Sequence, residues 1–402
     1  MNSEAQPVGL QFKPLDHVSA ISFASYASTA TVTPITLVLL AQELNFSLAA
    51  GGAIEAMRAS LLLLTLLVSG WVAAHWGKAF SLGWSSILSG VGLLLYSFAP
   101  AYSVVVLAAA LMGLGSGIVE ALLNPLVQDL HPDDSGRYMN TLNAFFSVGV
   151  FITVLGGGEL LSRGVSWRII MVLLGIVSIV TGILFLILNS SAPHVPTDDS
   201  AAVLRHKIAI LRNPRFPIFA LMMFFGGGVE GGLTFWSASY IQLHFEQLPR
   251  LGGVGTAAFA GGMIVGRLGS GRFVPQHRLS HLIIGSALLG VVVGVLAPLM
   301  TGLGWLIGVL FVAGLSVACF WPSIQSYSTD RIEGDSTSLF ILLSCGGIPG
   351  FGFAAWLMGL IGEARGLNAS LYVIPVFMAA LAALALFERN YEPRSSSSSS
   401  QR

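Results

Sequence analysis

The chain is poor in charge and almost free of cysteine. Only 9% of its 402 residues are Asp, Glu, Lys or Arg, whereas a soluble domain has about a quarter. This scarcity excludes an ordinary water-soluble domain, and the 54% of hydrophobic residues indicates a protein of the lipid bilayer. The formal net charge is zero, which gives no electrostatic reason to expect a nucleic-acid partner. The two cysteines, Cys319 and Cys345, both lie in apolar segments, so we expect free thiols.

Sequence signatures of catalysis are also missing. The chain has no Walker A motif, so we do not expect a pump driven by ATP hydrolysis. It has no HExxH, no CxxC and no nucleophile elbow. We therefore expect neither an enzyme nor a protein that holds a cofactor or metal ion.

Long apolar segments fill most of the sequence. Because a spanning helix needs about 20 mostly apolar residues, we predict an all-α integral membrane protein with twelve transmembrane helices. The polar stretch Met1 to Pro14 and the long first segment argue against a cleavable signal peptide. The predicted spans are Leu15–Gln42, Leu48–His75, Lys78–Ala99, Tyr102–Asp129, Arg137–Leu161, Trp167–Asn189, Pro214–Phe245, Leu251–Phe273, Leu279–Met300, Gly302–Ser328, Ser336–Ile361 and Asn368–Phe387.

The spans divide into two sets of six. We predict an N-terminal half over 1–189, a linker over 190–213, a C-terminal half over 214–390 and a disordered tail over 391–402. Short motifs recur between the halves. Asn124-Pro125 with Gln128 matches Trp321-Pro322 with Gln325, 197 residues later. Two parallel repeats of this kind place a substrate site near the membrane midplane, between the halves.

Basic residues predict the orientation. If the N-terminus is cytoplasmic, the loops and termini on that side hold thirteen of the Lys and Arg residues and those on the other side hold four. Cytoplasmic loops carry the excess of Lys and Arg. We therefore expect a multi-pass protein of the cell membrane with the linker and both termini in the cytoplasm.

Two carboxylic acids lie deep within apolar spans. Glu120 shares a helix face with Asn124 and Gln128, at a spacing of four residues. Glu230 lies near the middle of the seventh span and shares a face with Thr234. An ionisable residue inside a membrane is costly and usually faces a cavity or a partner. Either acid could couple transport to protons, and either could instead be a buried structural group.

Two arginines also fall within spans. Arg267 must have a partner or a cavity because arginine does not deprotonate in proteins. We expect it to form a gate contact or an ion pair. Arg58 follows Glu55 by three residues, a spacing that allows a local ion pair on one helix.

Further side chains suit a polyhydroxylated solute, because amides bind hydroxyl groups and flat aromatic rings stack on sugars. Each of them could equally serve helix packing. The candidate substrate-binding residues are Tyr26, Asn124, Gln128, Asn143, Trp236, Trp321 and Gln325.

Three stretches carry a family resemblance: GLGSGIVEALLNPLV in the fourth span, MNTLNAFFSVG in the fifth and FFGGGVEGGLTFWSASY in the seventh. They resemble the major facilitator superfamily and, within it, the fucose permease-like branch of sugar transporters. The resemblance implies two six-helix halves and a central cavity lined by the fourth span. The chain departs from that branch at Asn143, where a His is usual, and in the first span, which lacks an acidic residue. Ala74 also replaces the Asp of the superfamily's loop signature.

The leading hypothesis is a secondary-active transporter that moves a small polar solute, a sugar or sugar derivative, by proton symport with alternating access. Its partners would be the solute, protons and the bilayer, and it would act as a monomer. A proton-driven exporter of drugs or metabolites is the alternative. A membrane sensor ranks below both, because the linker and tail are too short for an output domain.

The orientation can be tested with a fused reporter enzyme that is active only in the cytoplasm. We predict that it is active at the C-terminus and inactive when inserted at Gly164, between the fifth and sixth spans. The reverse pattern would contradict the orientation.

Overall fold

The computed structural model describes residues 11–131, 135–192, 207–274, 276–333 and 336–391, and in these residues all regular structure is helical. Twelve segments are long and apolar enough to cross a membrane, which confirms the predicted fold class. Helices suit this environment because they satisfy their backbone hydrogen bonds internally. Most of the predicted tail and of the linker lies outside the described residues, and the predicted domain limits stay predictions.

Six spans precede residues 193–206 and six follow them. The first four spans are α1 (Pro14–Leu44), α2 (Leu48–Trp76), α3 (Lys78–Ser97) and α4 (Tyr102–Leu130). The fifth span consists of α5 (Ser135–Phe151), the π-helix η1 (Ile152–Gly156) and α6 (Gly157–Ser162), and the sixth is α7 (Trp167–Ile187). The seventh to ninth spans are α9 (Phe216–His244), α10 (Pro249–Phe273) and α11 (Leu279–Leu296). The tenth span consists of α12 (Leu303–Val317) and α13 (Phe320–Thr329), and the eleventh is α14 (Ser336–Arg365). The twelfth span consists of α15 (Leu367–Ser370) and α16 (Val373–Asn390).

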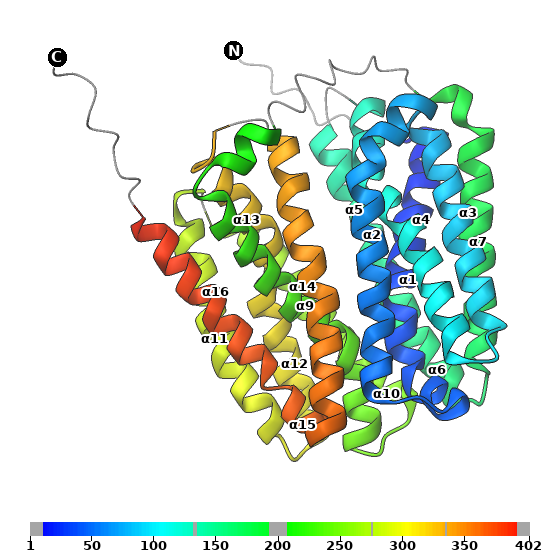
Figure 1. Ribbon diagram of the computed structural model, residues 1–402, viewed down its shortest axis with the longest axis vertical. Helices are drawn as coiled ribbons and strands as arrows, with labels where there is room; N and C mark the ends of the chain where they lie inside the picture. Colours follow the sequence, from blue (N-terminus) through cyan, green and yellow to red (C-terminus); the bar gives the residue numbers. More distant parts are fainter. Residues whose placement is uncertain (1–10, 132–134, 193–206, 275, 334–335, 392–402) are drawn as a thin grey trace, which may run out of the picture.

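The two sets of helices form two bundles that lie side by side, and the start of α1 and the end of α16 point toward the same end of the molecule (Figure 1). The bundles meet where α2 packs on α14, where α1 packs on α9, and where α10 packs on the fifth span. These six helices therefore form the interface across which the halves move if they rock against each other.

Close contacts hold the bundles together at the end opposite the termini. The backbone N–H of Ala49 donates to Oε2 of Glu363 at 3.1 Å, and that of Arg250 donates to Oγ of Ser162 at 2.8 Å. Glycine permits the approach of the backbones. A Cβ on Gly52 would lie 2.9 Å from Cα of Trp356, closer than real Cβ atoms come to other atoms.

Among the described residues, each ion pair at the terminus-bearing end lies within one half. Lys78 pairs with Asp129 at 2.6 Å in the first half, and Arg215 pairs with Glu388 at 2.7 Å in the second. His131 and Asp16, also both in the first half, lie 2.8 Å apart. The halves are thus fastened to each other at the end opposite the termini, while these charges brace each half separately.

We predict that Gly52→Leu prevents α2 and α14 from meeting at the end opposite the termini, because the added side chain overlaps the backbone of α14. A cysteine placed at Thr31, which lines the central cavity, should then react with a membrane-impermeant thiol reagent applied from that side, in a background with Cys319 and Cys345 replaced by Ser. Gly70→Leu is the control, since a Cβ there meets no atom within 4 Å. Equal labelling in the two variants would contradict the conclusion that the contact at Gly52 closes this end of the cavity.

Candidate functional site

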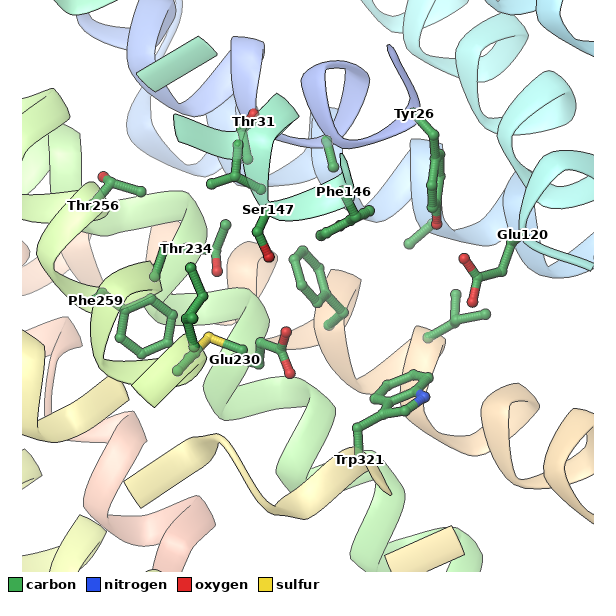
Figure 2. Close-up of a pocket in the computed structure, with 18 of the residues that line it drawn as sticks. Tyr26, Thr31, Glu120, Phe146, Ser147, Glu230, Thr234, Thr256, Phe259 and Trp321 are labelled. Carbon is green, nitrogen blue, oxygen red and sulfur yellow. The ribbon is translucent and has the colours of Figure 1, made fainter. Parts of the chain in front are cut away.

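A cavity of about 300 Å³ lies between the two halves. Its walls come from α1, α2, α4 and α5 of the first half and from α9, α10, α13 and α14 of the second. Figure 2 shows polar side chains from both halves directed into this space. The polar lining residues are Tyr26, Thr31, Arg58, Glu120, Ser147, Glu230, Thr234, Thr256 and Arg267.

Glu120 and Tyr26 form the polar part of the wall on the first half. The hydroxyl of Tyr26 points toward the carboxylate of Glu120 (Figure 2), and the two groups are close enough to interact. The Tyr26 ring also packs on Phe146, with 5.7 Å between the ring centroids. This places Glu120, in the fourth span, next to the first span.

Two glycines explain how Glu120 reaches the cavity. A Cβ on Gly113 would overlap the carbonyl of Arg58, and one on Gly117 would overlap the carbonyl of Leu62. These glycines let α4 lie directly against α2, in the manner of small residues at helix contacts in membranes. Glu120 follows Gly117 by three residues and so lies at the edge of that contact, on the cavity.

Arg58 is held by its own helix. Its Nε donates to Oε2 of Glu55 at 2.9 Å, and its Nη2 donates to Oε1 at 2.6 Å. The side chains are only 6% and 1% exposed, so this is a buried two-bond ion pair. The local pair predicted from the sequence is therefore present. The third guanidinium nitrogen, Nη1, is buried and has no hydrogen-bond partner.

Arg267 pairs with the other intramembrane acid. Its Nη2 lies 3.3 Å from Oε1 of Glu230, and its Nε donates to the carbonyl of Ala318 at 3.4 Å. That carbonyl is available because residue 322, one helical turn later, is a proline and has no N–H to donate. The tenth span breaks here, between α12 and α13. Arg267 thus connects α9, α10 and the break.

The cavity holds one charge that no ion pair balances. Glu55 balances Arg58, and Glu230 balances Arg267. Glu120 interacts with the neutral hydroxyl of Tyr26, and it has only a longer-range charge interaction with Arg58. With all five groups ionised the site carries a single net negative charge, and one bound proton or one cation would neutralise it.

Several candidate substrate-binding residues lie elsewhere. Trp236 is 1% exposed, and its Nε1 donates to the carbonyl of Ala355 at 2.8 Å. Gln325 donates to Oγ of Ser344 at 3.2 Å. Gln128 is exposed, and Asn124 is half-buried and has a partner. None of these four is among the lining residues, whereas Tyr26 and Trp321 are.

The side chain of Asn143 lies outside the described part of the structure. The next turns of the same helix do reach the cavity, through Phe146, Ser147 and Val150.

Sequence reasoning did not single out Thr256 or the aromatic side chains of Phe146, Phe259 and Phe351, which also line the cavity. Thr256 lies in a run of small and apolar residues, GVGTAAFAGG, and nothing in that run distinguishes a hydroxyl that faces a cavity from one that bonds its own helix. Here Thr256 does both, because its hydroxyl also donates to the carbonyl of Gly252 at 3.3 Å. Within the described residues no group of three metal-ligating side chains comes together.

Comparison with known proteins identifies the fold family. The sequence profile of the Major Facilitator Superfamily matches residues 18–349, which is most of the chain. This chain belongs to the Major Facilitator Superfamily. Members of this family are membrane transporters rather than enzymes.

Two related proteins match this chain over very different lengths. Membrane protein MosC of Rhizobium meliloti is 25% identical over 352 residues, which cover 86% of this chain and 83% of the relative. Sodium-dependent glucose transporter 1A of Mus musculus is 27% identical over 116 residues, which cover only 29% and 27% of the two chains.

Solved structures share the superfamily fold. A bacterial homolog of the human lysosomal transporter Spinster, in an inward-facing and occupied conformation, has a TM-score of 0.78 at 16% identity and covers 94% of this chain and 98% of its own. The D-xylose-proton symporter has a TM-score of 0.75 at 14% identity, with coverage of 94% and 98%. The nucleoside transporter NupG has a TM-score of 0.74 at 14% identity, with coverage of 94% and 99%.

The buried ion pair of α2 leads to a stability prediction. Arg58→Gln leaves Glu55 buried without its partner, and we expect a loss of about 3–5 kcal/mol in the free energy of unfolding. The double variant Glu55→Gln with Arg58→Gln should recover most of that loss, because no uncompensated charge remains.

Denaturant unfolding in detergent micelles measures both. Arg163→Gln is the control, since its pair with Glu159 is largely exposed and should be worth at most about 1 kcal/mol. Equal losses for Arg58→Gln and Arg163→Gln would contradict the prediction.

Proposed function

We propose that this protein is a proton symporter for a small, neutral, polar solute, a sugar or sugar derivative. It works by alternating access, as a single chain, in the cell membrane with both termini in the cytoplasm. One observation carries the proposal. Among the described residues, Glu120 is the only charged group lining the cavity that no ion pair balances, and it lies beside a mixed polar and aromatic wall that both halves build.

The energetics of the bilayer make Glu120 the proton carrier. A charged side chain at the centre of a membrane costs at least about 2.5–3.5 kcal/mol. Protonation of Glu120 removes the one unbalanced charge, so the loaded cavity with a neutral solute is neutral as a whole. Glu230 competes less well for this role, because Arg267 already balances its charge in an ion pair. We assign Glu230 and Arg267 to solute contact and gating.

The lining residues favour a polyhydroxylated solute. Trp321 and Tyr26 offer flat aromatic faces, and Thr31, Ser147, Thr234 and Thr256 offer hydroxyl groups. The stretches that resemble the fucose permease-like branch support a sugar, as do the names of the D-xylose-proton symporter and, over a shorter segment, the glucose transporter.

The contacts between the halves support alternating access. They gather at the end opposite the termini, through Gly52 and through the bonds of Ala49 and Arg250. With cytoplasmic termini, this conformation is closed toward the outside. Residues of a single chain line the cavity, which supports transport by one copy.

A proton-driven exporter is the second candidate, and the same observation supports it. An unbalanced carboxylate also attracts an organic cation, and a proton and a cation could then occupy Glu120 in turn. The two functions differ in direction: a symporter carries proton and solute together, whereas an exporter exchanges them.

Proteoliposome transport distinguishes the candidates. We expect an inward proton gradient to drive accumulation of a neutral sugar chosen by a thermal-shift screen, and we expect Glu120→Gln to abolish uphill accumulation while counterflow exchange of that sugar persists. Glu159→Gln, at a half-buried site outside the cavity, is the matched control and should retain accumulation.

Uphill accumulation that survives in Glu120→Gln would overturn the coupling role. Accumulation that depends on an outward proton gradient, and that favours organic cations, would replace the symporter by the exporter.

A further inference from the structure

Arg58 has a hydrogen-bonding capacity that the protein leaves unused. A guanidinium carries five N–H donors in a fixed fork. Glu55 takes the donors of Nε and Nη2 on one edge, and the remaining nitrogen, Nη1, has no hydrogen-bond partner. The side chain is 6% exposed and yet lines the central cavity. A buried donor of this kind is costly unless it is paired, so a solute oxygen that reached Nη1 from the cavity would relieve that cost.

The position of this guanidinium is fixed from several sides. Two bonds to Glu55 set its plane, in the side-by-side geometry typical of arginine and carboxylate. The carbonyl of Arg58 lies against Gly113, so α2 cannot shift away from α4 without loss of that contact. A donor that is pre-positioned in this way loses little entropy when a solute binds.

The charges around Arg58 select the kind of acceptor. Glu55 already balances the guanidinium, and Glu120 and the hydroxyl of Tyr26 are its other polar neighbours. An anionic solute would therefore meet a site that is neutral or negative. The cationic centre of an organic cation has no lone pair for Nη1 and would be repelled by the guanidinium. A neutral hydroxyl accepts from Nη1 and can also donate to Glu120 or Tyr26.

We propose that Arg58 anchors the solute, by donating from Nη1 to an oxygen atom of a neutral polyol or sugar, and that Glu55 is the residue that positions it. This proposal takes the solute class from the proposed function. It assigns recognition of the solute to Arg58 and Glu55 in α2 rather than to Glu120. A hydroxyl that binds between Arg58 and Glu120 meets both the anchor and the proton site.

Binding to the purified full-length protein tests the anchor. Titration calorimetry measures the binding of five probes: D-glucose, D-xylose, myo-inositol, D-glucuronate and tetraphenylphosphonium. The main variant is the double Glu55→Gln with Arg58→Gln, which removes the donor without leaving a buried charge, and thermal unfolding without probe confirms its fold. The double Glu159→Gln with Arg163→Gln removes an exposed helical pair and is the control.

We expect at least one neutral probe to bind the unmodified protein and the control equally, and to bind the main variant about tenfold to a hundredfold more weakly, since a hydrogen bond to a charged group is lost. Glu55→Asp, which keeps the charge of the pair but shortens the side chain that positions Arg58, should raise the KM of uptake more than it lowers the maximal rate, which a purely structural defect would not do.

Unchanged affinity for a neutral probe in the main variant would overturn the anchor and leave proton symport intact, because that is tested by Glu120→Gln. Preferred binding of D-glucuronate would overturn the neutral class. If only tetraphenylphosphonium binds, or if none of the five probes binds, both the anchor and the sugar assignment fall.

Monodeoxy analogues of the bound sugar identify the anchored oxygen. For one analogue, the loss of affinity on removing the hydroxyl should disappear in the main variant, because the bond is already absent there. Losses that remain additive for every analogue would contradict a direct bond from Arg58.

Discussion

The cost of holding charge inside a bilayer is the constraint on which the rest of this structure depends. It explains why Arg58 keeps Glu55 one turn away on its own helix and why Arg267 reaches across to Glu230. Once these pairs are made, Glu120 remains as the unbalanced charge of the cavity. The role proposed for it rests on this balance of charges rather than on any motif around it.

Close helix packing turns this electrostatic pattern into a site. Gly113 and Gly117 bring α4 onto α2, so Glu120 and Arg58 face one cavity although they lie in different spans. Pro322 frees a carbonyl in the tenth span, and Arg267 uses it. Small residues and prolines, which are poor helix formers in water, are thus used here for close contact and for helix breaks that neighbouring side chains satisfy.

The two halves contribute differently to the cavity. The first supplies the unbalanced acid and a fixed arginine with a spare donor, and the second supplies an acid–arginine pair that is partly exposed. A neutral solute between the halves would touch the proposed proton site, Glu120, on one side and the pair of Arg267 and Glu230 on the other. In that arrangement one binding event contacts both halves, which is what coupled transport by alternating access requires.

The sequence by itself determined the twelve spans and the presence of costly ionisable residues at 58, 120, 230 and 267, because hydropathy and charge are local properties of the chain. It also predicted the pair of Glu55 and Arg58, which needs only the spacing of one helix. Only the tertiary structure decided that Arg267 pairs with Glu230, that Trp236 and Gln325 bond within the second half, and that Tyr26 and Trp321 line the cavity. These outcomes depend on the rotation of each helix about its axis, and that rotation is set by contacts with neighbouring helices, which no single segment encodes.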